Sequence, residues 1–360
     1  MLLYSPYELG ALPLANRMVM SPMTRSRATG SQPNELMRLY YRQRAGAGLL
    51  IAEGTQTSPF AKGFPAVPGI YTEAHIAGWR IITDDVHATG GRIFLQLWHC
   101  GRISHPLNQP EGRPPIAPSA IAADAFVVLD DGSRVKVQTP RALETRELPA
   151  LLDEFMTAAR NAMSAGFDGV EIHAANGYLL HQFLNDCSNQ RTDRYGGTVA
   201  GRIRFVVEVA EAVSAAIGPR RTGIRLSPVN RYNDMSDSDP NGLYATLLPE
   251  FSRIGLAYVN IVEGEAGVTR DARGFDYAAA RRRFNGTWIA NNLYDRELAE
   301  AALAQGYADL VSFGRPFIAN PDLVERYRLG AALNAVDYST AYRGGAAGYV
   351  DYPSLSQGSG

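Results

Sequence analysis

The chain has 360 residues, of which 46% are hydrophobic and 20% are charged, and its formal net charge is −1. This composition is typical of a globular protein with a large core, and a charge near zero argues against nucleic acid as the main partner. Two cysteines, Cys100 and Cys187, are too few for a disulfide framework or a cysteine-bound metal, and we expect no metal site. The amino terminus does not resemble a signal peptide and no apolar run reaches 18 residues. We therefore expect a cytoplasmic protein with no membrane partner.

Short apolar runs alternate with amphipathic stretches along the chain. The runs predict eight strands, at 17–20, 49–52, 92–97, 169–172, 222–226, 257–262, 287–290 and 310–313. The amphipathic stretches predict helices at 34–44, 72–89, 151–164, 201–217, 241–254, 293–304 and 321–329. Eight strands that alternate with helices indicate an α/β fold, a single (β/α)8 TIM barrel. No Gly-x-Gly-x-x-Gly follows the first strand, so a dinucleotide-binding doubly wound sheet has no support.

One long segment, residues 101–148, interrupts the alternation after the third strand. It is rich in proline, and Asp131-Gly132 lies between two apolar runs in 126–138, a pattern that predicts a β-hairpin. Barrel enzymes carry their active sites at the carboxyl ends of the strands. We therefore expect this insertion to form a lid or a pocket wall there. Residues 1–360 are expected to form one domain, with a flexible tail at about 354–360.

Distinctive polar residues fall at the carboxyl ends of most of the predicted strands. In strand order they are Ser21–Arg25, Glu53–Thr55, Gln96 with Trp98-His99, His173 with Asn176, Arg225, Asn291-Asn292 and Gly314-Arg315. A barrel interior is filled mainly by branched apolar side chains, so packing alone does not require this set. The pattern predicts an active site on this rim. The segment 230–241, after the fifth strand, follows no pattern that we can interpret.

The most informative segment, His173-Ala-Ala-Asn176-Gly-Tyr178, follows the fourth strand. His173 and Asn176 can both donate hydrogen bonds to one oxygen, and Tyr178, with an ordinary pKa of about 10, is protonated at neutral pH. Together they can hold a carbonyl oxygen while a proton is given to a neighbouring atom. Taken alone, the six residues fit an ordinary polar loop equally well. The polar clusters at the other strand ends favour the catalytic interpretation of this motif. We expect the nearby His181 to be a structural residue.

Six motifs, in order, resemble those of the old yellow enzyme family, FMN-dependent ene-reductases on a (β/α)8 barrel. The motifs are Ser21-Pro-Met-Thr-Arg25, Gln96-Leu-Trp-His99 with Gly101-Arg102, His173-Ala-Ala-Asn-Gly-Tyr178, Asn189-Gln-Arg-Thr-Asp-Arg-Tyr-Gly-Gly197, Ser312-Phe-Gly-Arg315 with Pro316, and Gly348-Tyr-Val-Asp-Tyr-Pro353. The resemblance spans about residues 3–352. It implies a non-covalently bound FMN and a nicotinamide hydride donor, NADPH or NADH. Position 24 is threonine rather than cysteine, and in this the chain resembles the classical branch of the family.

The resemblance also implies which residues bind FMN. They are Pro22, Met23, Thr24, Gly54, Gln96, Arg225, Asn291, Asn292, Gly314 and Arg315. Gly314 and Arg315 would hold the phosphate, because a guanidinium can clamp it by two parallel hydrogen bonds. Asn291 and Asn292 would add backbone and side-chain donors, although many members of the family have glycine near this position.

The flavin ring would meet the remaining residues of that set. Arg225 would lie beside the pyrimidine end, where it can stabilise negative charge, and Gln96 would bond the adjacent imide edge. Thr24 would donate its hydroxyl near the hydride-carrying nitrogen. Pro22, Met23 and Gly54 would give backbone contacts and a close approach to the ring.

For the substrate, the resemblance implies an activated alkene stacked on the flavin, such as an α,β-unsaturated carbonyl, a nitroalkene or a maleimide. His173 and Asn176 would hold its oxygen, the flavin hydride would go to the β carbon, and Tyr178 would protonate the α carbon. The nicotinamide donor would use the same face in a preceding half-reaction. The pocket would be lined by Phe64, Trp98 and Tyr349. The protein is expected to be a monomer or a small homo-oligomer.

Two rival classes share the barrel. A relative of the dienoyl-thioester reductases would carry a cluster bound by cysteines that this chain lacks. A metal-assisted hydrolase would need several histidines and carboxylates at the strand ends, where only His99 and His173 lie. A barrel that binds a ligand without turnover stays open at this point, and a yellow colour of the purified protein distinguishes a flavoprotein from it.

Overall fold

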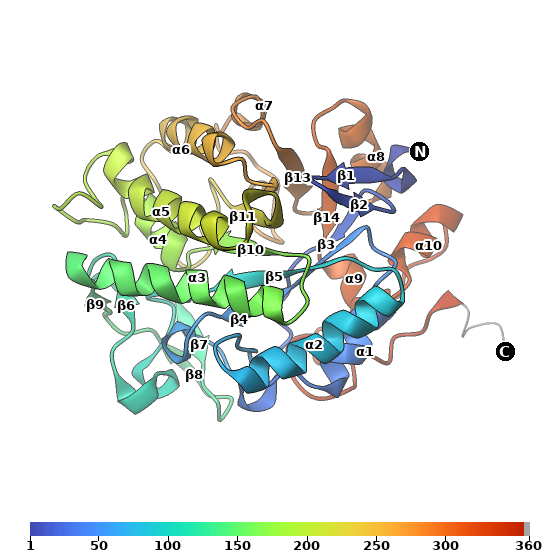
Figure 1. Cartoon of the computed structure of the whole chain (residues 1–360), viewed down its shortest axis with the longest axis horizontal. Coiled ribbons are helices and arrows are strands. Elements are labelled where there is room, and N and C mark those ends of the chain that lie inside the picture. The colour runs from blue at the N-terminus through green and yellow to red at the C-terminus, as the bar shows by residue number, and fades with distance from the viewer. Residues whose placement is uncertain (356–360) are drawn as a thin grey trace.

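Eight parallel strands form a closed barrel in the computed structural model, which describes residues 1–355 (Figure 1). The strands are β3 (Met18–Met20), β4 (Leu49–Gln56), β5 (Ile93–Trp98), β10 (Gly169–Ala174), β11 (Thr222–Leu226), β12 (Tyr258–Val262), β13 (Thr287–Asn291) and β14 (Leu310–Phe313). They correspond one to one with the eight predicted strands. The last strand pairs with the first, Val311 opposite Met18, and so closes the barrel. The predicted (β/α)8 fold is confirmed.

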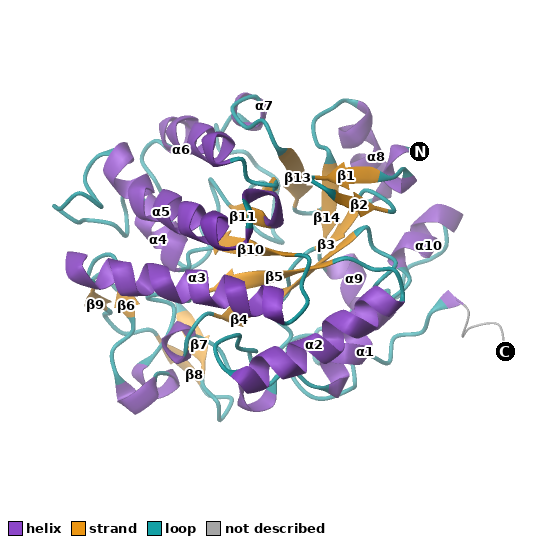
Figure 2. Ribbon diagram, viewed as in Figure 1, coloured by secondary structure: helices purple, strands orange, loops and turns teal. Residues whose placement is uncertain are grey.

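Helices surround the barrel (Figure 2). The helices that match predictions are α1 (Glu35–Gln43), α2 (Glu73–Ala88), α3 (Leu148–Ser164), α5 (Val199–Ile217), α6 (Pro240–Ile254), α8 (Arg296–Ala304) and α10 (Leu323–Leu329). Helix α8 begins three residues later than predicted, because Asn292 and Leu293 have positive φ and the side chain of Asp295 caps the helix. Not predicted were the short helices α4 (Leu179–Leu184), α7 (Tyr277–Arg281) and α9 (Arg315–Ala319). Fewer than two turns give too little periodicity to detect.

The segment between β5 and α3 contains two pairs of short strands. Strands β7 (Phe126–Val128) and β8 (Arg134–Lys136) form an antiparallel hairpin, and β6 (Ile116–Ala117) pairs with β9 (Arg141–Ala142). The hairpin turns where Asp131-Gly132 predicts it, with Gly132 at φ 84°. Val127 packs in one cluster with Trp98, so the hairpin lies against the end of β5.

A second hairpin, β1 (Tyr7–Leu9) and β2 (Leu12–Leu14), was not predicted. Leu9 and Leu14 pack in one cluster with side chains from the barrel strands, including Val19 and Phe94. These strand residues lie before the carboxyl ends, so the hairpin closes the amino-terminal end of the barrel. The opposite end is left for the polar residues.

Within residues 1–355, no helix has both the length and the apolar character needed to cross a membrane. The tail expected to be flexible, 354–360, falls outside the described residues from position 356 on. The expected compartment, the oligomeric state and the single-domain boundary stay predictions.

Candidate active site

Two cavities open at the carboxyl ends of the barrel strands, with volumes of about 760 and about 470 Å³. We call them the larger and the smaller cavity. Pro22, Met23 and Tyr342 line both, so the two adjoin. Of the other predicted site residues, the larger cavity is lined by Thr24, Phe64, Gln96, Trp98, His173, Asn176 and Tyr178, and the smaller by Arg225, Asn291, Asn292, Gly314 and Arg315. The fold therefore brings most of the predicted site into one place.

Tyr349 is an exception. It is 0% exposed, and its ring stacks on that of Tyr40 with centroids 4.2 Å apart. The guanidinium carbons of Arg25 and Arg27 lie 5.1 and 4.9 Å from the centroid of the Tyr349 ring. Because protein groups surround this ring, the structure corrects the expectation that Tyr349 lines the substrate pocket. It belongs to the packing that holds the carboxyl-terminal segment onto the barrel.

Gly54 makes room for an aromatic ring of the neighbouring strand. A Cβ at this position would lie 2.6 Å from Cε3 of Trp98, and the pairing of β4 with β5 shifts register between Ala52 and Thr55. The close approach that glycine allows is therefore to Trp98. Gly54 thus makes room for a ring that lines the larger cavity, and its expected contact with the cofactor stays a prediction.

One wall of the larger cavity is aromatic. The centroids of the Trp98 and Tyr178 rings are 4.8 Å apart, and those of His173 and Tyr178 are 5.1 Å apart. Phe64 stacks on Trp98 at 5.7 Å. Strand β10 delivers His173, and the turn at Asn176, with φ 56°, directs the chain toward α4 so that Tyr178 returns to the same wall.

Burial fixes the protonation states on this wall. It holds the pKa of His173 well below its usual value, and the neighbouring charge of Arg225 acts in the same direction. Burial likewise raises the pKa of Tyr178 well above 10. At neutral pH the wall therefore presents a neutral imidazole and a protonated phenol. Within the described chain, Nδ1 of His173 is buried without a hydrogen-bond partner.

The amide of Asn176 is held from behind. Its Oδ1 accepts a hydrogen bond from Nδ2 of Asn230 at 2.7 Å, while the backbone N–H of Asn176 donates to Oγ of Ser227 at 2.8 Å. The amide nitrogen of Asn176 is thus left for the cavity that the residue lines. Asn230 was not among the predicted site residues, because its segment carries no interpretable pattern.

A buried polar layer includes Gln96 of the larger cavity and Arg225 of the smaller one. The carboxylate of Glu171, 0% exposed, accepts from Nε2 of Gln96 at 2.8 Å and from Nδ2 of Asn260 at 2.9 Å. Burial raises the pKa of Glu171, and the charge of Arg225 opposes that rise. Glu171 was not predicted, although a carboxylate inside a buried strand is a signal that partners must exist.

Arg225 is buried and has donors to spare. One terminal nitrogen donates to Oδ1 of Asn291 at 2.8 Å. The other, Nη1, has no hydrogen-bond partner among residues 1–355. A buried cation with an unused donor is costly unless an anionic or acceptor group completes it, so Arg225 fits a ligand with an acceptor at this point.

The side chains of Asn291 and Asn292 are already used by the protein. Nδ2 of Asn291 donates to Oγ of Ser21 and to the carbonyl oxygen of Ser312, at 3.0 and 2.9 Å. Nδ2 of Asn292 donates to three carbonyl oxygens, of which that of Glu263 is nearest at 2.7 Å. The side-chain donors expected to reach a phosphate are thus occupied by the protein, whereas the expected backbone donors of these two residues, which line the smaller cavity, stay a prediction. Asn291 orients Arg225, and Asn292 holds the loop after β12.

The combined shape and chemistry fit a flavin mononucleotide. The larger cavity is flanked by aromatic rings and suits a flat ring system, with Gln96 as a polar contact, while Arg225, whose Nη1 has no partner among residues 1–355, lines the adjoining smaller cavity. The smaller cavity lies beside Gly314 and the exposed side chain of Arg315, directly after the eighth strand. Barrels commonly bind phosphate after their last two strands. The further lining residues that were not predicted from the sequence include Ser26, Tyr232, Tyr342 and Arg343.

Comparisons with known proteins agree with this site. Residues 2–334 match the NADH:flavin oxidoreductase / NADH oxidase family. The chain is 46% identical to 12-oxophytodienoate reductase 1 of Oryza sativa subsp. japonica over 360 residues, 99% of this chain and 93% of that protein. It is 41% identical to 12-oxophytodienoate reductase 2 of Arabidopsis thaliana over 357 residues, 98% and 96% of the two chains.

Solved structures give the same result. Morphinone reductase in complex with tetrahydroNAD superimposes with a TM-score of 0.94 at 47% identity, covering 99% of both chains. The matched family binds FMN, and the family's nicotinamide coenzyme is represented in that complex by an NAD analogue. The chain therefore belongs to the old yellow enzyme family, and it is an NAD(P)H-dependent FMN oxidoreductase.

Proposed function

We propose that this protein reduces activated C=C bonds with NADPH or NADH, acting on α,β-unsaturated carbonyls, nitroalkenes and maleimides. The observation that carries the proposal is the single cavity wall formed by His173, Asn176 and Tyr178, which combines two donors for an oxygen with a protonated phenol. The relatives named as reductases of 12-oxophytodienoate and of morphinone support the same class of reaction.

Bound FMN would supply the hydride chemistry that connects the nicotinamide coenzyme and the alkene. Arg315 and Gly314 would hold its phosphate at the smaller cavity, and Nη1 of Arg225, which has no partner among residues 1–355, would donate to its pyrimidine end. Gln96 would bond the imide edge. Thr24 would donate its hydroxyl to the ring, and Pro22 and Met23 would give backbone contacts between the two cavities.

His173 and Asn176 hold the carbonyl or nitro oxygen of the substrate. The neutral imidazole has one N–H to give, and the Asn176 amide nitrogen gives a second. Negative charge that develops on the oxygen strengthens both hydrogen bonds, since bonds to charged acceptors are about twice as strong as neutral ones. The pair therefore draws electron density from the double bond as the hydride arrives at the β carbon.

Tyr178 gives the proton to the α carbon. Its ring is fixed by edge contacts with Trp98 and His173, and burial keeps its pKa high enough for the phenol to stay protonated across the physiological range. Burial also makes the phenolate costly, so the proton is replaced from solvent after each turnover. Phe64 and Trp98 pack beside the substrate.

The coenzyme and the alkene use the same cavity in turn, which makes the mechanism ping-pong. The Tyr178→Phe variant tests this proposal by stopped flow. We expect FMN reduction by the coenzyme to be nearly unchanged and alkene reduction to slow by about 10²–10⁴-fold, the usual contribution of a general acid. Equal rates for variant and wild type with cyclohexenone would remove Tyr178 from its role.

The cofactor has its own test. Acid precipitation of the yellow protein should release all of the chromophore as FMN, because non-covalent binding at Arg315 suits a mononucleotide. Flavin that stays with the pellet, or that proves to be FAD, contradicts the assignment of the smaller cavity to the phosphate.

A further inference from the structure

Asn230 lies directly behind the substrate-oxygen donor Asn176. It is 2% exposed and belongs to segment 230–241, which has no interpretable sequence pattern. Its Nδ2 donates to Oδ1 of Asn176 at 2.7 Å. The larger cavity is lined by Asn176 but not, among the described residues, by Asn230. Asn230 can therefore act on a ligand only through its neighbour.

The orientation of the Asn230 amide is set by the backbone. Its Oδ1 accepts from the N–H of Tyr232 at 3.1 Å and from the N–H of Ala266 at 3.5 Å. A backbone N–H can only donate, so the oxygen end of the amide must face these two groups. The nitrogen end is then directed at Asn176, and no alternative orientation satisfies the same neighbours.

That orientation passes on to Asn176. The two ends of an amide have nearly the same shape, so hydrogen bonds decide which end points where. Because Asn230 donates, Asn176 must offer its oxygen backward and its nitrogen toward the cavity. The turn itself is fixed separately, by the bond from the Asn176 N–H to Ser227 and by Nδ2 of Asn233, which donates to the Asn176 carbonyl at 2.8 Å.

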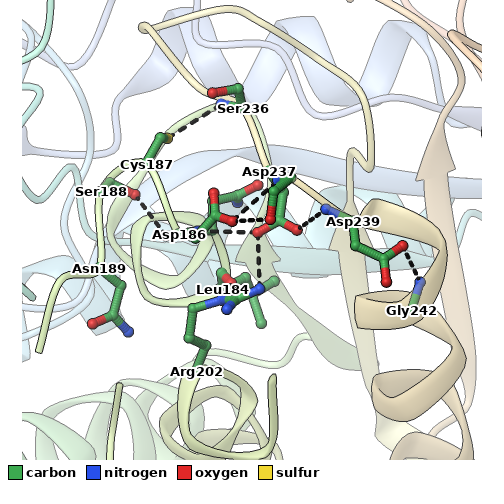
Figure 3. Close-up of polar contacts among 12 residues, drawn as sticks. Leu184, Asp186, Cys187, Ser188, Asn189, Arg202, Ser236, Asp237, Asp239 and Gly242 are labelled. Carbon is green, nitrogen blue, oxygen red and sulfur yellow. Dashed lines mark hydrogen bonds and ion pairs between the residues drawn. The ribbon is translucent and has the colours of Figure 1, made fainter. Parts of the chain in front are cut away.

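The segment that carries Asn230 is anchored at its far end (Figure 3). The Asp237 carboxylate, 0% exposed, accepts from the N–H of Asp186 at 3.0 Å and from Arg202 at 3.1 Å. The N–H of Ser236 donates to the sulfur of Cys187 at 3.2 Å. These contacts tie the segment to the loop after α4, so Asn230 approaches Asn176 from a fixed support.

We propose that Asn230 is a positioning residue that makes Asn176 a hydrogen-bond donor toward the substrate oxygen. The inference rests on the proposed role of Asn176 in the reaction. It predicts that the polarity of the oxygen site depends on the group at position 230. With a donor there, the site binds an anionic oxygen; with an acceptor there, the Asn176 amide turns over and presents its own oxygen.

The test uses FMN-loaded protein and para-chlorophenol, followed by absorbance. In the wild type the bound phenol should ionise well below its solution pKa and give a long-wavelength charge-transfer band with the flavin. In Asn230→Asp, one carboxylate oxygen still accepts from the backbone N–H groups, and the other accepts from Nδ2 of Asn176. We expect phenolate affinity to fall by about tenfold or more, the loss of one bond to a charged group, and the apparent pKa of the bound phenol to rise.

A double-mutant cycle separates orientation from added charge. In an Asn176→Ala background the carboxylate introduced by Asn230→Asp is still present, but there is no amide to turn over, so Asn230→Asp should have little further effect. The Asn241→Asp variant, an exposed position at the end of the same segment, adds the same charge as a matched control. FMN content and thermal unfolding confirm that each variant is folded and loaded.

Two results would overturn the inference. An equal loss from Asn230→Asp in both backgrounds would mean that charge or a displaced loop is responsible. No loss in either background would mean that Asn176 is oriented by other groups. If Asn176→Ala by itself binds phenolate as tightly as the wild type, the proposed role of Asn176 fails, and the inference fails with it.

Discussion

The amide nitrogen of Gln96 donates to the carboxylate of Glu171 over 2.8 Å, which leaves the amide oxygen of Gln96 for the larger cavity that the residue lines. Glu171 sits opposite Gln96 in the pairing of β10 with β5 and also accepts from Asn260. A carboxylate offers only acceptors to its two amide neighbours, so both must point their nitrogens at it. An acceptor oxygen on Gln96 matches the N–H of a flavin imide.

Replacing Glu171 should therefore weaken FMN binding, although the residue does not line either cavity within the described chain. In Glu171→Gln one of the two acceptors becomes a donor, so either Gln96 or Asn260 must turn over or lose its partner. We expect the Kd for FMN to rise by about tenfold, as one hydrogen bond is lost. Titration of the apoprotein with FMN, followed by quenching of flavin fluorescence, measures this Kd.

Asn260→Ala is the matched control, since it removes a Glu171 donor and leaves Gln96 in place. Unchanged affinity for FMN in Glu171→Gln contradicts the prediction.

Glu53 should make stability depend on pH. This carboxyl is 1% exposed on β4, and burial raises its pKa to about 7. A carboxyl whose pKa is higher in the folded state stabilises the fold. This contribution is fully present at pH values below the pKa of the unfolded chain, about 4.5, and is lost as the pH rises through about 7. In Glu53→Gln that contribution disappears. We would measure the free energy of unfolding with urea at several pH values. Between pH 5 and 7, this free energy should rise for Glu53→Gln relative to the wild type by at most about 1.4 kcal/mol per pH unit.

The difference in stability between the wild type and Glu53→Gln reports Glu53 alone. The buried His99 and His181 give stability the opposite pH dependence, but they are present in both proteins, so their effect cancels. Burial lowers the pKa of each to about 3, so they favour the folded state as pH rises toward 6.5. Parallel pH profiles for wild type and Glu53→Gln would show that the Glu53 carboxyl ionises at its ordinary pKa.

Gly54→Ala tests the packing under the cavity wall. The new Cβ would lie 2.6 Å from the Trp98 ring, so the ring or the strand has to move. Overpacking of this kind costs about 1–3 kcal/mol, and the shift should also disturb the stack of Trp98 on Phe64. Urea unfolding and tryptophan fluorescence report the two effects. Gly46→Ala is the control, since a Cβ there meets no atom within 4 Å; equal stability of the two variants contradicts the prediction.

The barrel and the residues that line its rim could be predicted from the sequence, because strand periodicity and the polar residues at strand ends are local signals. The supporting residues could not. Asn230 and Glu171 act through partners on other strands and loops, and only the folded chain shows that Asn230 reaches Asn176. The sequence also could not show that the side chains of Tyr349 and Asn292 are used elsewhere. Their residue types fit a binding site, but the fold uses their side chains for its own contacts.

The last prediction concerns the oxygen-binding pair. Burial and the charge of Arg225 hold the pKa of His173 well below its usual value, so the imidazole is neutral and its N–H can donate to an anionic oxygen without itself titrating near neutral pH. A para-substituted phenol on FMN should then bind as the phenolate, and the pH dependence of its charge-transfer band should report the phenol alone.

His173→Ala should weaken that band and raise the apparent pKa of the bound phenol. The loss of a hydrogen bond to a charged group is about 1.5–3 kcal/mol, or roughly tenfold or more in affinity. His87→Ala serves as the control, because that imidazole pairs with Asp168, which directly precedes β10 and so lies at the opposite end of the strand from the cavities. Spectral titrations at several pH values decide the matter: if His173→Ala binds phenolate as tightly as the wild type, His173 is part of the framework and the substrate oxygen must be held by other donors.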